Sequence, residues 1–126
     1  MDNAVDLPGY KYYVEPDGSR PDVKVTFVNL VPGTGAVNGL VIDADAEVLD
    51  RRERNYERVE LEPGLWAYVG TADARARYEA GPSVVSREYL ELVRGGFAAL
   101  GQLERYERTT EPPEVPVRDL RRVDLD

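Results

Sequence analysis

Apolar residues in the first half of the chain alternate with polar ones or cluster in short runs, which is typical of β-strands. Residues 9–14 (G-Y-K-Y-Y-V) are rich in aromatic side chains and predict a first strand that ends at a Pro-Asp-Gly turn. Residues 23–31 predict a second strand buried on both faces, because their second half is apolar at odd and even positions. Residues 37–42 predict a third strand. Gly39 in its middle indicates a bulge, or a group that packs against the backbone.

A short helix and a hairpin are predicted next. Asp43 or Asp45 can cap a helix that ends near residue 55. Residues 56–61 alternate again, and the Pro-Gly pair that follows turns the chain into residues 65–70. We expect these two strands to pair through a loop longer than the tightest hairpin turn, since proline cannot adopt the positive φ which that turn requires.

The second half of the chain is predicted to be mainly helical. Residues 72–79 predict a weak helix that Gly-Pro stops. Ser86 is expected to cap the clearest helix, whose apolar residues recur about every 3.6 positions and form one stripe. These residues are Tyr89, Leu92, Val93, Phe97 and Leu100. Residues 111–126 begin with E-P-P-E-V-P-V and predict an extended C-terminal tail beside a domain of residues 1–110.

The predicted order is three strands, one helix, two strands and two helices. Consecutive short strands with one helix between them are typical of an α+β fold. We therefore expect a compact, barrel-like mixed β-sheet with peripheral helices.

Composition narrows the possible functions. Hydrophobic residues make up 42% and charged residues 32%, which is typical of a soluble globular protein. No transmembrane helix or signal peptide is recognisable, so we expect a cytoplasmic protein that binds no membrane. The net charge of −8 argues against a nucleic acid partner. The absence of cysteine and histidine excludes thiolate catalysis, Ser-His-Asp triads and Cys/His metal sites, which leaves a carboxylate as the expected acid or base of an enzyme.

Glu53 is the best candidate for this carboxylate. It follows Leu49 by four positions, so both side chains lie on one face of the predicted helix. If Leu49 packs on the sheet, Glu53 faces the interior or the lip of a cavity, where burial disfavours its charged form and raises the pKa. The alternative is that Glu53 ends the helix at the rim and pairs with Arg52 or Arg58. Periodicity alone does not decide between them.

Residues 37–61 (V-N-G-L-V-I-D-A-D-A-E-V-L-D-R-R-E-R-N-Y-E-R-V-E-L) resemble the centre of the gamma-glutamylcyclotransferase-like superfamily, which includes avirulence-induced-gene-like proteins. In that family a strand of form V-x-G-x-V precedes a short helix with L-D-x-x-E, and a tyrosine opens the next strand. Gly39 stands at the strand glycine, Leu49-Asp50 at the L-D pair, Glu53 at the catalytic glutamate and Tyr56 at the tyrosine.

Two further segments extend the resemblance to roughly residues 4–110. A-V-D-L-P-G-Y-K-Y-Y resembles the family's second strand, and S-R-E-Y-L-E-L-V resembles its late helix, where Tyr89 matches a commonly aromatic position. The family's first strand and its Y-G-S loop have no match, because the only Gly-Ser, Gly18-Ser19, follows the second strand. We expect a sheet without that strand to have open edges, so that a chain starting at Met1 is marginally stable or dimerises or aggregates.

The resemblance implies gamma-glutamylcyclotransferase activity. The alpha-amino group of a small gamma-glutamyl substrate attacks its own side-chain amide, which releases 5-oxoproline and an amine. Glu53 is then the general acid/base, and the reaction needs no metal and no cofactor. Tyr56, Tyr89 and Gly39 are the candidate substrate-binding residues.

Other interpretations stay open. Each of the two tyrosines is also compatible with ordinary half-buried packing. The chain is alternatively a non-catalytic family member that binds a small ligand or a protein partner, or an α+β domain whose likeness to the family is accidental. A monomer or a weak homodimer is expected.

Overall fold

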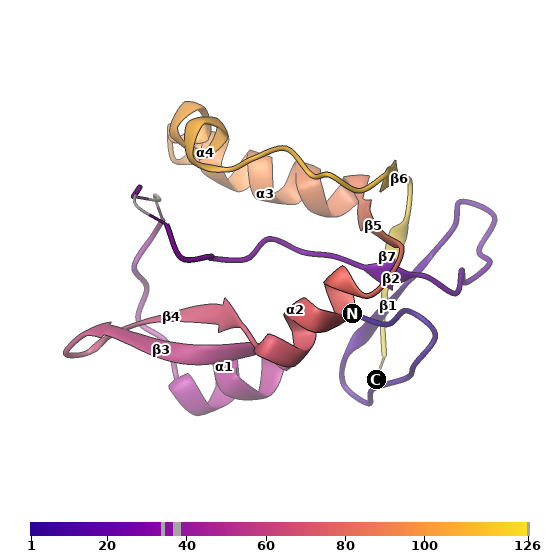
Figure 1. Cartoon of the computed structure of the whole chain (residues 1–126), viewed down its shortest axis with the longest axis horizontal. Helices are drawn as coiled ribbons and strands as arrows, with labels where there is room; N and C mark the ends of the chain where they lie inside the picture. Colours follow the sequence, from indigo (N-terminus) through magenta and orange to yellow (C-terminus); the bar gives the residue numbers. More distant parts are fainter. Residues whose placement is uncertain (34, 37–38, 126) are drawn as a thin grey trace.

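The structure is a computed structural model that describes residues 1–33, 35–36 and 39–125 (Figure 1). Within these ranges the chain forms four helices and seven strands, and the strands belong to three small sheets. The architecture is therefore an α+β mixture. The sheets formed by the described residues do not close into the expected barrel.

Five short strands lie together at one end of the molecule: β1 (Lys11–Val14), β2 (Lys24–Val25), β5 (Ser83–Ser86), β6 (Val117–Arg118) and β7 (Arg121–Asp124) (Figure 1). β1 and β7 pair antiparallel, whereas β5 lies between β2 and β6 and is parallel to both. Residues 111–126, which we expect to be extended, therefore supply one strand to each of these two sheets. β5 is an additional strand that the sequence pattern does not predict.

The hydrophobic core lies where these two sheets meet. Tyr13, Val25, Val84 and Leu120 form one buried cluster, and each comes from a different strand or from the β6–β7 corner. Asn3 is a fully buried polar residue beside this cluster: its Nδ2 donates to the carbonyl oxygens of Tyr13 and Pro21, both at 2.9 Å. Its Oδ1 accepts from the Tyr13 amide at 2.7 Å. The core is therefore built by contacts between residues far apart in sequence.

The first residues of the chain pair with the outer edge of β2. The Asn3 amide donates to the Val23 carbonyl at 3.0 Å, and the Val25 amide donates to the Met1 carbonyl at 2.8 Å. The amino group of Met1 donates to the Val25 carbonyl at 2.9 Å, and burial lowers the pKa of this amino group. This edge of the sheet is thus paired.

The predicted hairpin is confirmed as β3 (Tyr56–Glu62) and β4 (Leu65–Gly70), which pair antiparallel. The prediction of a longer loop is wrong, because only Pro63 and Gly64 separate the two strands. Gly64 has φ of 81°, and proline followed by a left-handed glycine is the combination that a type II turn uses. A shift in register between Glu60 and Glu62 accompanies this turn, as a β-bulge would.

The helices are α1 (Ala46–Arg52), α2 (Ala72–Glu79), α3 (Arg87–Ala99) and α4 (Leu103–Thr109). Asp45 caps α1 and Ser86 caps α3, as predicted, because each side chain accepts a backbone N–H of the first turn. The expected stripe of α3 is only half-covered: Phe97 stacks on Tyr106 of α4 at 4.6 Å, whereas Leu92 is 71% exposed. No helix among the described residues is long and apolar enough to cross a membrane.

Two predicted strands do not form over their expected length. Of residues 23–31 only β2 is a strand, and Val28 and Val31 are exposed instead of buried. Of residues 37–42, Val37 and Asn38 lie outside the described residues, and 39–42 form no strand. The apolar side chains of this segment, Leu40, Val41 and Ile42, are 67%, 75% and 65% exposed. The reason is the lack of a partner: neither 27–33 nor 39–42 has a strand ladder with any described residue.

Candidate functional site

Glu53 lies at the turn between α1 and β3. Its amide donates to the Leu49 carbonyl at 2.9 Å and closes the helix, and its carbonyl accepts from the Tyr56 amide at 3.0 Å. The residue is half-buried, like Leu49 on the same helix face. Within the part of the chain that the structure describes, the Glu53 carboxylate forms no hydrogen bond or ion pair. The local sequence thus places the Glu53 carboxylate at the edge of the domain, where no hydrogen bond or ion pair with a described residue holds it.

The neighbouring carboxylate of the L-D-x-x-E motif is used differently. Asp50 accepts from the Tyr68 hydroxyl at 2.6 Å and pairs with Arg58 at 3.5 Å. Arg58 also lies over the Trp66 ring, 4.9 Å from its centroid. The alternative in which Glu53 pairs with Arg58 is therefore not what the structure has.

The charge of Glu53 acts on four half-buried tyrosines, Tyr10, Tyr56, Tyr68 and Tyr89. Burial raises the pKa of Tyr10 and of Tyr56, and the negative charge of Glu53 raises both further. Burial also raises the pKa of Tyr89 to about 12, with smaller contributions from Tyr106 and Glu53. The structure thus brings Glu53, Tyr56 and Tyr89 into one neighbourhood, although Tyr89 is on α3.

The hydroxyls of Tyr56 and Tyr89 both bind the backbone of Val28. Tyr56 donates to the Val28 carbonyl at 2.8 Å, and Tyr89 accepts from the Val28 amide at 3.0 Å. The neighbouring Phe27 ring meets Tyr89 edge-on, with centroids 4.9 Å apart. The segment after β2 therefore runs between the β3–β4 hairpin and α3 (Figure 1). It is held by side-chain hydrogen bonds instead of by a sheet, and these include the bond from the Gly70 amide to Asn29 Oδ1 at 2.7 Å.

Lys11 and Tyr10 complete this cluster. The Lys11 ammonium lies 4.4 Å from the Phe27 ring centroid and 5.3 Å from that of Tyr10. Burial and then Arg122 lower the pKa of Lys11, and the charge of Glu53 acts in the opposite direction. Sequence reasoning does not single out Lys11 or Tyr10, because their approach to Glu53 depends on how β1 sits against α1. Their only signal is the G-Y-K stretch at the start of the first predicted strand.

Gly39 is not drawn into this cluster. It is exposed and outside any strand, and no described atom lies within 4 Å of the position that a Cβ would take. The expectation that a group packs against its backbone is therefore wrong. Because no described strand lies beside Gly39, no described group comes close enough to its backbone to require a glycine there.

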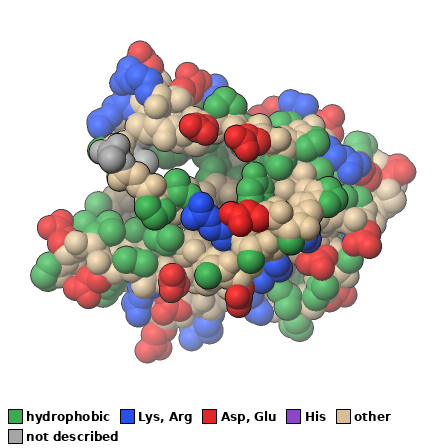
Figure 2. All heavy atoms as spheres, in the orientation of Figure 1, with side chains coloured by type: hydrophobic (Ala, Val, Ile, Leu, Met, Phe, Trp, Pro, Cys, Tyr) green, Lys and Arg blue, Asp and Glu red, His purple; other side chains and the backbone are tan. Residues whose placement is uncertain are grey.

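The surface around the cluster is uneven. Figure 2 shows an opening between α3 and the segment that follows β2. A pocket of about 460 Å³ lies elsewhere, between the end of α2, β5 and the segment before β6, and its lining includes neither Glu53, Tyr56 nor Tyr89. The described ranges contain no group of three or more acidic residues arranged to hold a metal ion.

Comparison of the chain with known protein families, with curated proteins and with solved structures finds no match.

Proposed function

We propose that the chain catalyses the intramolecular aminolysis of a gamma-glutamyl amide, with Glu53 as the general acid/base and 5-oxoproline as a product. The observation that carries this proposal is the contrast between the two carboxylates of the motif. Asp50 is tied to Tyr68 and Arg58, whereas Glu53 is half-buried among tyrosines and has no bonded partner among the described residues. A carboxylate held in this way is available to accept and return a proton.

In the proposed reaction Glu53 first accepts a proton and later returns it. Glu53 takes a proton from the substrate's alpha-ammonium group, and the resulting amine attacks the side-chain amide carbon. The ring nitrogen of the tetrahedral adduct loses its second proton to water. The bond to the amide nitrogen then breaks, and this nitrogen receives the proton from Glu53 and leaves as an amine. The attack is intramolecular, so holding the substrate in a folded conformation supplies much of the rate.

Lys11 is the cation best placed to orient such a substrate. Its ammonium lies over Phe27, 4.4 Å from the ring centroid. Burial and Arg122 lower the pKa of Lys11, and the charge of Glu53 opposes them. In this proposal Lys11 attracts the substrate's alpha-carboxylate while Glu53 faces the alpha-ammonium group. The aromatic rings around them reduce the competition from water.

A second candidate is a non-catalytic protein that binds a small gamma-glutamyl ligand at this place. The observation that favours it is the Val28 peptide, which already occupies the hydroxyls of Tyr56 and Tyr89. The Tyr56 hydroxyl then donates its hydrogen to the chain itself and is not available to a developing oxyanion, whose stabilisation catalysis of acyl transfer ordinarily requires. Of the two hydroxyls, that of Tyr89 accepts and keeps its hydrogen.

One assay separates the two candidates. The purified chain is incubated with gamma-glutamylalanine, and 5-oxoproline and alanine are quantified together; alpha-glutamylalanine is the matched control. Catalysis releases both products in equal amounts from the gamma-linked isomer and no alanine from the alpha-linked one. Saturable binding without turnover supports the second candidate. Neither binding nor turnover with any gamma-glutamyl dipeptide contradicts both.

A further inference from the structure

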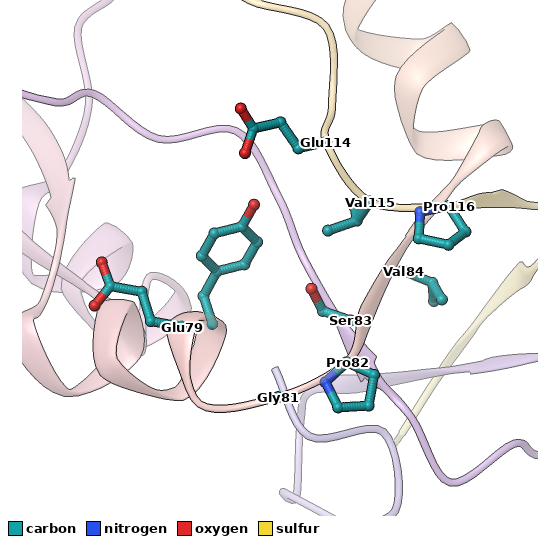
Figure 3. A pocket seen from close by; sticks show the side chains of 9 residues that line it. Glu79, Gly81, Pro82, Ser83, Val84, Glu114, Val115 and Pro116 are labelled. Atoms are coloured by element: carbon teal, nitrogen blue, oxygen red, sulfur yellow. The ribbon is translucent and has the colours of Figure 1, made fainter.

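The pocket at the end of α2 is a separate feature with its own chemistry. It is lined by the last turn of α2, the Gly-Pro loop, the start of β5 and the segment before β6 (Figure 3). Its volume of about 460 Å³ lies within the range usual for small-molecule sites. Because none of its lining residues belongs to the Glu53 cluster, what it binds is independent of the proposed function.

Ser83 is the first sign of a ligand. The residue is only 6% exposed, yet its hydroxyl forms no hydrogen bond with another described residue. Figure 3 shows this hydroxyl directed into the pocket. The buried side-chain atoms without a partner among the described residues do not include this oxygen, so it opens onto the pocket and can bond to water or to a ligand there.

Two further polar groups converge on the same space. Glu114 and Tyr78 both line the pocket, and both side chains are exposed to solvent. Among the described residues neither side chain forms a hydrogen bond or an ion pair. Glu79 adds a second carboxylate at the rim, although it is shared with Arg75 at 3.4 Å. The polar side of the pocket therefore consists of carboxylates and hydroxyls.

The opposite side of the pocket is apolar. Pro82, Val84, Val115 and Pro116 line it. The cation near the pocket, Lys24, donates to the Arg77 carbonyl at 3.0 Å and is not among the lining residues. The pocket thus combines an apolar wall with the carboxylate of Glu114, and the Lys24 ammonium lies at its edge, 3.6 Å from the position that a Cβ on Gly81 would take.

We propose that this pocket binds a small organic ammonium ion with a short apolar chain. The ammonium group is placed between the Glu114 carboxylate and the hydroxyls of Tyr78 and Ser83, and its chain lies against Val115. Three N–H donors match three acceptors, and the charge selects a cation over a neutral or anionic molecule of the same shape.

The test is a titration of the full chain with n-pentylammonium chloride, followed by backbone amide NMR. We expect saturable shifts at Ser83, Val84 and Val115 with affinity in the millimolar range, about tenfold weaker binding of 1-pentanol, and none of pentanoate. Equal binding of the alcohol, binding of pentanoate, or the absence of saturable shifts at these amides overturns the proposal.

Two variants and a control localise the charge. Glu114→Gln is expected to weaken n-pentylammonium binding about tenfold, since it replaces a charge-assisted hydrogen bond by a neutral one. Ser83→Ala is expected to weaken it less. Glu111→Gln removes an exposed carboxylate from the same segment, outside the pocket lining, and should leave the affinity unchanged. If Glu114→Gln and Glu111→Gln bind alike, the assignment to this pocket is wrong.

Discussion

The double attachment of the Val28 peptide predicts a measurable loss of stability when either tyrosine hydroxyl is removed. Tyr56→Phe leaves the Val28 carbonyl without its donor, and Tyr89→Phe leaves the Val28 amide without its acceptor. A hydrogen bond of this kind contributes about 0.5–1.5 kcal/mol, and these two lie near the surface, so each variant should lose about 0.5–1 kcal/mol. With a urea m-value of about 2 kcal/mol/M, the midpoint falls by about 0.3–0.5 M.

Because both bonds hold the same peptide, the two losses should not be additive. Once one bond is missing, the segment after β2 moves more freely and the second bond contributes less, so the double variant loses less than the sum. Tyr12→Phe is the matched control, since its hydroxyl forms no hydrogen bond with a described residue and its ring stays beneath Arg20. Wild-type midpoints for Tyr56→Phe and Tyr89→Phe, or a loss equal to that of Tyr12→Phe, refute this account of the segment.

Three further stability predictions concern the core. Ser86→Ala removes both the α3 cap and the donor to the Leu120 carbonyl at 2.8 Å, and should cost about 1–3 kcal/mol by urea denaturation. Asn3→Ala leaves the three backbone groups bonded to it without partners and should cost more than Ser86→Ala; an equal or smaller loss contradicts its role as an anchor. Burial raises the pKa of Tyr13 from 10.0 to about 12, so its stabilising effect is full below pH 10 and declines as the pH rises toward 12. Alkaline unfolding followed by circular dichroism should therefore begin above pH 10, and Tyr13→Phe should make the dependence shallower.

The sequence predicts the elements that depend on neighbouring residues. Asp45 and Ser86 cap their helices through bonds to residues two or three positions away, and the Pro-Gly turn joins β3 to β4 locally. Such signals are complete within a short window of sequence. The helix predicted to end near residue 55 forms as well, although it ends at Arg52 and Glu53 closes it.

Elements that depend on distant partners are where sequence reasoning fails. β5 is a strand because Ser83 and Val85 pair with residues at both ends of the chain, and its four residues carry no alternation. The apolar run 39–42 has strong strand character but no partner strand among the residues that the structure describes. The sequence pattern indicates that a segment is able to form a strand. The segment forms one only where the fold places another strand beside it.

The residues of the candidate site also fall into two groups: those that are close in sequence and those that only the fold brings together. Glu53 and Tyr56 are close in sequence, and the family resemblance names both as candidate site residues. Tyr89 reaches them because α3 crosses the segment that carries Val28, which no local signal specifies. Lys11 joins them through β1, whose pairing with β7 closes only when the C-terminal residues are in place.

The central claim is that Glu53 carries the proton in a gamma-glutamyl cyclisation, and the most direct test is 5-oxoproline release from gamma-glutamylalanine by Glu53→Gln. Glutamine keeps the size of the side chain and cannot exchange a proton, so turnover should fall about 10²–10⁴-fold while urea denaturation stays close to wild type. Glu57→Gln, an exposed carboxylate on β3, is the matched control and should keep full turnover. Release of 5-oxoproline by Glu53→Gln at the wild-type rate would contradict the claim.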